Sequence, residues 1–271
     1  MESDLVIRIM NTSWIIWDLF FLVPWFYILY KRNFKHVVYT SIIFGLYCAF
    51  QDAFVWYNIT QTRVIIWPDS WINDDNILKF VSRWIWYIYY DFSYPAIMLS
   101  LTMILLAGHH RVSIKEKIVW LSSLYIGWYI THYLTVNVPI FMMPMITVTR
   151  EMGSMRNIQM IMVIGGLNIC NLLLNDCRVF LLLVLGFVIY FAMEFNLYIH
   201  GIRNVDNIIT MVDNSIIEWN SGLPVMFLGT CFIKDWMIPN GCIKFHKSIF
   251  NYILIFLFTC YIIFQFCVPI N

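Results

Sequence analysis

Acidic residues occur within stretches of the sequence that are otherwise apolar. A carboxyl group inside a membrane costs about 2.5–3.5 kcal/mol on insertion scales, so it usually faces the interior of a helix bundle and has a partner or a function. Shielded from water, it can keep its proton near neutral pH, which suits a general acid or a proton relay. We therefore expect catalytic roles for four acids and one nearby histidine: Asp18, Asp52, Asp91, Glu194 and His132.

Aromatic side chains surround three of these acids, in a chain of which 18% is Phe, Trp or Tyr. Rings three or four positions from an acid share its helix face, where their π-faces can hold an apolar ligand or stabilise a cation. The alternative is an interfacial belt, because Trp and Tyr favour the edges of a membrane. The rings that we expect to bind substrate are Trp14, Trp17, Trp56, Tyr87, Tyr90 and Tyr94.

Two of the acidic stretches are similar to each other. WIIWDLFFLVPW contains Asp18 and Pro24, and WIWYIYYDFSYP contains Asp91 and Pro95. In both, aromatic residues precede an acid, and a proline follows the acid within six residues. Because a proline interrupts helix hydrogen bonding, we expect a kink near each carboxyl group.

The elements that must position these side chains are membrane helices. Of 271 residues, 61% are hydrophobic and 12% are charged, whereas about a quarter of the residues in soluble domains are charged. A spanning helix needs about 20 mostly apolar residues. The pattern predicts an all-α integral membrane protein in which residues 1–271 form one transmembrane domain. The predicted spans are 13–30, 36–57, 82–107, 117–135, 158–175, 179–200 and 248–268, with a shorter apolar segment at 223–238.

The distribution of Lys and Arg favours eight crossings over seven, because these residues concentrate in cytoplasmic loops. With eight helices both termini lie on the non-cytoplasmic side, and ten cations face the cytoplasm against seven outside. If 223–238 does not cross, Lys234, Lys244 and Lys247 move outside and the excess is reversed. We therefore expect about eight transmembrane helices, with seven as the fallback.

This topology places the acids at a common depth. Counted from the outer end of each span, they lie roughly five to nine residues deep, or about 8–14 Å along a helix. His132 lies at or just above this layer. Four acids from four helices in one layer favour a shared polar cavity that opens outward. The alternative is that each acid bonds to a neighbouring helix and only fixes the packing.

The stretch 203–222 has apolar and polar residues at helical spacing, so we expect it to lie along the outer interface. An ordered polar loop is the alternative. The stretch leads into EWNSGLP, from Glu218 to Pro224, which is typical of a turn followed by a helix start. Glu218 would then bind substrate as part of a lid over the outer cavity, or the motif only caps the helix.

Several chemistries are disfavoured by what the sequence lacks. The seven cysteines are scattered and do not have the Cys/His spacing of a zinc site. The motifs G-x-x-x-x-G-K-[ST], H-E-x-x-H and G-x-S-x-G do not occur. We therefore expect no metal and no cofactor. A net charge of +1 without a basic cluster argues against nucleic acid as a partner.

Three functions fit this composition. The first is a membrane-embedded cyclase, isomerase or lipid-modifying enzyme that acts on an isoprenoid or lipid by acid–base chemistry. Its partners are the bilayer and a lipophilic small molecule; Asp52 or Glu194 donates the proton, and Asp18 or Asp91 takes one off. The second is a proton- or cation-coupled transporter or channel, which also needs acids at one depth and broken helices. The third is a non-catalytic binding or assembly protein.

Overall fold

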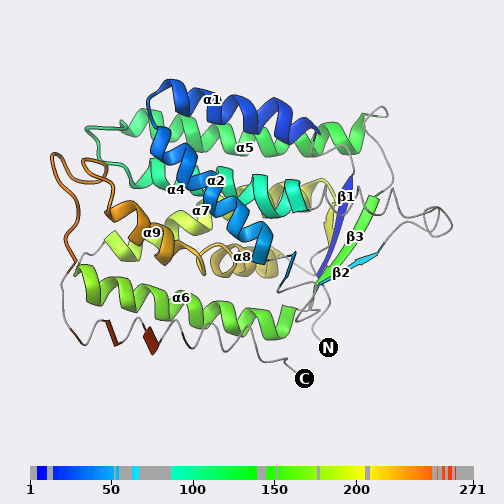
Figure 1. Cartoon of the computed structure of the whole chain (residues 1–271). Coiled ribbons are helices and arrows are strands. Elements are labelled where there is room, and N and C mark those ends of the chain that lie inside the picture. The colour runs from blue at the N-terminus through cyan, green and yellow to red at the C-terminus, as the bar shows by residue number, and fades with distance from the viewer. Residues whose placement is uncertain are drawn as a thin grey trace. The chain divides into compact units, whose positions relative to one another are not determined.

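The fold was obtained as a computed structural model (Figure 1). It describes residues 5–10, 15–51, 53–54, 63–66, 87–138, 145–150, 152–175, 178–204, 208–245, 249, 252–253, 256–257 and 260. This part of the chain is mostly helical, as predicted. Contacts divide the chain into two compact units. The first comprises Met1–Ser100, Ser122–Met152 and Ala192–Asp206, and the second comprises Leu101–Leu121, Gly153–Phe191 and Asn207–Asn271.

Helices occupy the first six predicted spans. In chain order they are η1 (Ile15–Leu22) continuing as α1 (Val23–Lys31), α2 (Lys35–Gln51), η4 (Tyr87–Ser93) continuing as α4 (Tyr94–Leu106), α5 (Ile114–Asn137), α6 (Met152–Leu174) and α7 (Arg178–Ile199). Two shorter helices follow, α8 (Ile208–Ile217) and α9 (Leu223–Cys231). Most of the predicted span 248–268 lies outside the described residues.

A proline marks the change from π-helix to α-helix in both similar acidic stretches. η1 and η4 are π-helices, and Pro24 and Pro95 are the second residues of the α-helices that follow them. Proline has no N–H to donate, and its ring collides with the carbonyl group four residues earlier. The wider π-turns before it accommodate this interruption. Asp18 and Asp91 therefore both lie in a π-helical segment just before a proline.

A four-stranded antiparallel sheet belongs to the first unit and was not predicted. Its strands are β1 (Leu5–Met10), β2 (Arg63–Ile66), β3 (Met145–Arg150) and β4 (Arg203–Asn204), in the order β2-β3-β1-β4 (Figure 1). Ile7 pairs with Val148 of β3 and with Arg203 of β4. The β-branched residues of LVIRIM, RVII and MITVTR suit a pleated strand. Along the described chain, a pair of helical segments separates each strand from the next.

The helices differ in whether they combine the length and the apolar composition that crossing a membrane requires. Within the described residues, Arg178–Ile199 is the helix with the length and apolar composition of a span. Shorter apolar helices cover Lys35–Phe50, Asp91–Leu106 and Gln159–Leu174. α9 has nine residues, about 14 Å, whereas the apolar core of a bilayer is about 30 Å thick. α9 alone is therefore too short to be a span.

Close approach of α2 to η4 fixes the position of the second acidic segment. At Gly45 of α2, an added Cβ would lie 2.7 Å from the carbonyl oxygen of Phe92 and 3.0 Å from the Cβ of Ala96. A glycine is therefore required where α2 crosses the junction of η4 and α4. This contact holds the backbone next to Asp91 against α2.

Candidate functional site

The two π-helical segments meet in the first unit, where Asp18 of η1 contacts η4, the segment that carries Asp91. η1 contacts η4, and the side chain of Ser93 is hydrogen-bonded to the carboxyl group of Asp18. Asp18 and Asp91 are both buried, with 8% and 5% of their surface exposed. The contact with Ser93 therefore brings Asp18 against the segment that carries Asp91.

The hydrogen bonds of Ser93 indicate what Asp18 can do chemically. The Ser93 hydroxyl donates to the carbonyl oxygen of Ile88 over 2.8 Å. A serine hydroxyl has one proton and two lone pairs. The hydroxyl can donate its one proton to Asp18 or to Ile88, and while it donates to Ile88 its oxygen can accept a hydrogen bond from a protonated Asp18. Oδ1 of Asp18 has no hydrogen-bond partner among the described residues, so the site suits a carboxyl group that exchanges a proton with a ligand.

Three aromatic rings from three helices cluster at Trp17, the residue before Asp18. Trp17 stacks on Trp128 of α5 with ring centroids 3.8 Å apart, and Tyr94 lies 4.2 Å from Trp128 and 6.2 Å from Trp17. Trp17 and Trp128 are fully buried. Two predicted substrate-binding rings, Trp17 and Tyr94, are thus brought together. Trp128 was not predicted; its place four residues before His132, on the same helix face, was the available signal.

His132 extends this stack toward the end of α7. Its ring lies parallel to Trp128 at 5.1 Å, and the ring of His200 is 6.1 Å away. Nδ1 of His132 bonds to the carbonyl oxygen of Trp128 over 2.9 Å, and Nδ1 of His200 bonds to that of Asn196 over 2.8 Å. Because a carbonyl group only accepts, both Nδ1 atoms carry the proton. In the neutral rings both Nε2 atoms are therefore acceptors.

The remaining predicted residues are placed differently. Glu194, on the part of α7 that belongs to the first unit, is completely buried. Glu218 belongs to the second unit, where it accepts a hydrogen bond from the hydroxyl of Tyr190. For Tyr87 and Tyr90 the structure describes only the helical backbone of η4. Three predicted residues lie outside the described residues: Asp52, Trp14 and Trp56.

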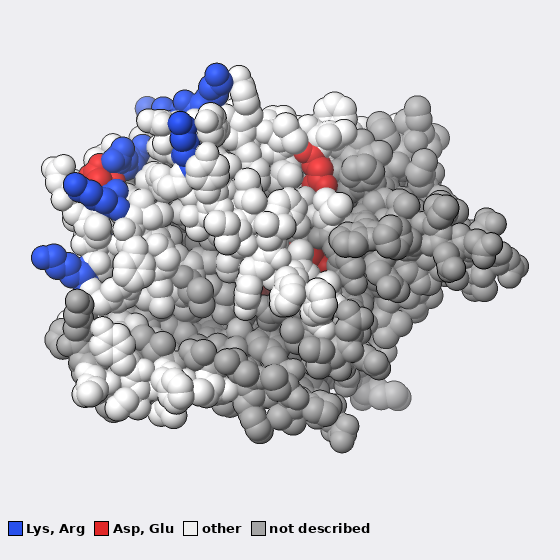
Figure 2. Space-filling model, in the orientation of Figure 1, with Lys and Arg blue, Asp and Glu red and all other residues white. Residues whose placement is uncertain are grey.

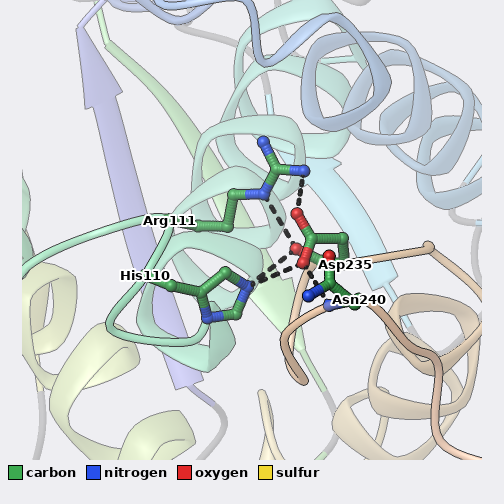
Figure 3. Close-up of polar contacts among 4 residues, drawn as sticks. All are labelled: His110, Arg111, Asp235 and Asn240. Atoms are coloured by element: carbon green, nitrogen blue, oxygen red, sulfur yellow. Dashed lines mark hydrogen bonds and ion pairs between the residues drawn. The ribbon is translucent and has the colours of Figure 1, made fainter.

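A second polar cluster joins two loops of the second unit and was not predicted (Figure 3). Arg111, in the loop between α4 and α5, donates through Nη2 to the Asp235 carboxylate and through Nε to its backbone oxygen over 2.8 Å. The backbone N–H of Asn240 donates to Oδ1 of Asp235 over 2.6 Å, and His110 lies 3.3 Å from the same oxygen. The Asn240 hydrogen bond, with Arg111 and His110, holds the pKa of Asp235 below its usual value.

This arrangement fastens the loop after α9 to the loop after α4, and we call it the Asp235 latch, formed by His110, Arg111, Asp235 and Asn240. Trp236 strengthens it, because its indole N–H donates to the Met103 carbonyl group over 2.9 Å. Across the described ranges, no group of three His, Cys, Asp or Glu side chains is placed to hold a metal ion. No family model, curated protein or solved structure matches the chain.

Proposed function

We propose that the chain is a polytopic membrane protein that acts as an enzyme on an isoprenoid or other lipophilic substrate by acid–base chemistry. The observation that carries the proposal is the position of Asp18. Its buried carboxyl group is bonded to Ser93, and the neighbouring indole of Trp17 is stacked on Trp128. A proton donor beside aromatic faces in an apolar layer is what carbocation chemistry on a lipid requires.

The sheet supports a repeated crossing of the membrane. Its four strands hydrogen-bond to one another, so they must lie on the same side of the bilayer. Between successive strands the described chain has two helical segments, which together would cross and return. This agrees with an outer N-terminus and with outer loops that carry β2, β3 and β4. We propose eight membrane segments with both termini on the non-cytoplasmic side, with seven as the fallback.

The distribution of side chains on α5 also supports a lipid environment. Thr131 and Thr135, which are polar, are completely or almost completely buried. Ile126 and Ile130, which are apolar, are 57% and 47% exposed. In the view of Figure 2, most of the described surface is uncharged. Soluble proteins rarely expose large contiguous apolar surfaces, whereas helices in a bilayer face lipid with such residues.

In the proposed reaction, Asp18 takes the proton-donor role that the sequence alone assigned to Asp52 or Glu194, and transfers its proton to a carbon–carbon double bond of the substrate. The resulting carbocation is stabilised by the faces of Trp17 and Trp128. Asp91 or His132 then takes a proton from the substrate, which forms a new double bond and a neutral, isomerised or cyclised product. The proton returns to Asp18 between turnovers, so no other reactant is consumed. Because both indoles are fully buried, the substrate must replace one of the ring contacts.

Mass spectrometry of lipophilic compounds that stay bound after gentle detergent purification tests this proposal. We expect wild type to retain one isoprenoid or lipid stoichiometrically and Asp18→Asn to lose it. Glu116→Gln, a change at the N-terminal end of α5, is the matched control and should behave as wild type. Bulk lipid alone in all three proteins would contradict the proposal.

A second function, proton-coupled transport, is favoured by one observation. The helical segment formed by α8 and α9 is interrupted by a turn at 218–222, and interrupted helices are typical of transporters. Vesicles that contain the protein and a pH-sensitive dye would distinguish the two functions. A proton flux that depends on a second solute supports transport, and no flux above that of empty vesicles supports the enzyme.

A further inference from the structure

Residues 208–231 form one bent helical segment. The turn between α8 and α9 keeps helix-like hydrogen bonds, from Glu218 N to Asn214 O over 2.9 Å and from Ser221 N to Ile217 O over 3.2 Å. α8, the turn and α9 together contain 24 residues. At the rise of an α-helix this is about 36 Å, enough to cross the apolar core of a bilayer.

The bend lies beside the middle of α7, the helix with the length and composition of a span. The side-chain N–H of Asn220 donates to the carbonyl oxygen of Leu183 over 3.1 Å, and Glu218 is bonded to Tyr190. A Cβ added at Gly186 would lie 2.1 Å from Oδ1 of Asn220. Glu218 thus contacts α7 at Tyr190, nearer the C-terminal end of α7 than Leu183, which Asn220 contacts. Segment 208–231 and α7 therefore run antiparallel.

The other side of the bend is held by α6. A Cβ added at Gly166 would lie 2.6 Å from the ring of Pro224, and Cys170 is 3.5 Å from the Pro224 carbonyl oxygen. The bend therefore sits between two helices that the sequence predicts as spans. These contacts favour a position inside the membrane for 208–231 over the outer interface that its amphipathic spacing predicts.

Polar groups are concentrated at the bend. Three side-chain atoms, Nδ2 of Asn214, Nε1 of Trp219 and Oδ1 of Asn220, are buried and have no hydrogen-bond partner among the described residues. The three residues are 2%, 8% and 1% exposed. An unpaired buried polar group costs free energy, so its presence needs an explanation, such as a role in binding or catalysis.

We propose that 208–231 is a bent polar membrane segment and that Glu218, with Tyr190, forms a proton-binding site in its bend. The ligand is a proton carried by the Glu218 carboxyl group. Tyr190 donates a hydrogen bond to the ionised form, and Asn214 and Trp219, within four residues of Glu218 in sequence, carry buried donors. This inference rests on the proposed membrane topology and adds a carboxyl site in the second unit to those of the first.

Carbodiimide labelling of the full-length protein in phosphatidylcholine vesicles tests the site. Dicyclohexylcarbodiimide enters the bilayer and modifies protonated carboxylic acids, whereas a water-soluble carbodiimide reaches carboxyl groups in water. We expect the apolar reagent to modify Glu218 and the water-soluble reagent to modify Glu116, at the N-terminal end of α5. In Tyr190→Phe, loss of the hydrogen bond to the ionised form should speed the labelling of Glu218 roughly tenfold. Equal labelling of Glu218 and Glu116 by the water-soluble reagent would overturn the inference.

Cysteine accessibility separates this inference from the membrane topology on which it rests. Val184→Cys places a thiol on the exposed face of α7, and Ile216→Cys places one on the exposed face of α8 near the middle of 208–231. We expect both to be protected from a membrane-impermeant maleimide. Protection of position 184 with rapid labelling of position 216 would overturn the inference alone. Rapid labelling of both would contradict the proposed membrane topology as well.

Discussion

The carboxyl group of Asp18 is hydrogen-bonded to the hydroxyl of Ser93. This contact joins two π-helical segments, each followed by an α-helix with a proline as its second residue. Ser93 lies two residues after Asp91, so the contact also fixes the segment that carries the second acid. The two interrupted helices are therefore arranged around one buried polar region.

The first prediction concerns this contact. Ser93→Ala should lower the free energy of unfolding by about 1–3 kcal/mol, because it leaves a buried carboxyl group without its partner. Combined with Asp18→Asn in a double-mutant cycle, it should show a coupling free energy of about 1 kcal/mol. The measurement is denaturant unfolding in detergent, followed by tryptophan fluorescence. Strictly additive effects would show that the contact does not link the two segments.

The second prediction concerns the stacked rings. Trp128→Ala removes a fully buried indole that contacts Trp17, Tyr94 and His132, so it should cost about 3–5 kcal/mol of stability. Trp128→Phe keeps a ring in the stack and should cost clearly less. The same unfolding assay checks both variants. Equal losses in the two would mean that ring stacking does not hold the first unit together.

The third prediction uses two helical glycines with different surroundings. At Gly186 an added Cβ meets Asn220 at 2.1 Å, whereas at Gly229 of α9 nothing lies within 4 Å. Gly186→Ala should therefore destabilise the protein by about 1–3 kcal/mol through overpacking. Gly229→Ala should be neutral or stabilising by up to about 1 kcal/mol, because alanine is the better helix former. A harmless Gly186→Ala would argue against the close contact between α7 and the bend.

The fourth prediction concerns the pH dependence of the Asp235 latch. Folding lowers the pKa of Asp235, so the folded state favours the ionised carboxylate. Its stabilising effect is fully present above the ordinary value of 3.8 and is lost as the pH falls through the lower value of the folded protein. The protection of residues 232–241 against amide hydrogen exchange, corrected for the intrinsic exchange rate at each pH, should therefore fall below about pH 4. Asp235→Asn should exchange quickly at neutral pH and lack this acid step; an unchanged step in that variant would exclude Asp235 as its cause.

The helices were predictable because each long apolar segment can be recognised from its own residues, without knowledge of the rest of the chain. The strands were missed because LVIRIM, RVII and MITVTR are four to six residues long and are stabilised by one another across large distances in the sequence. Their pairing could not be predicted without knowing that the helices between them return the chain to the place where the strands meet. The bent segment was only half predicted, since helical spacing indicated α8 but not the contacts of Asn220 and Glu218 with α7.

The same distinction applies to the candidate site. Asp18, Asp91, Trp17 and Tyr94 could be identified because an acid in an apolar stretch is rare and the rings lie close to it in sequence. Trp128 is one of 12 tryptophans; its spacing places it on one helix face with His132 but does not indicate that it contacts Trp17. The Asp235 latch involves charged residues in loops, where charges are ordinary, so only the fold shows that they meet.

The most direct test of the central claim is the incorporation of solvent deuterium into lipid. The protein in vesicles is incubated in D2O with a total lipid extract that includes isoprenoids, and the lipids are analysed by mass spectrometry. Acid–base catalysis at carbon predicts that wild type and Glu116→Gln add deuterium to one lipid species over time, while folded Asp18→Asn does not. No incorporation by wild type, or equal incorporation by Asp18→Asn, would contradict the assignment of Asp18 as the proton donor.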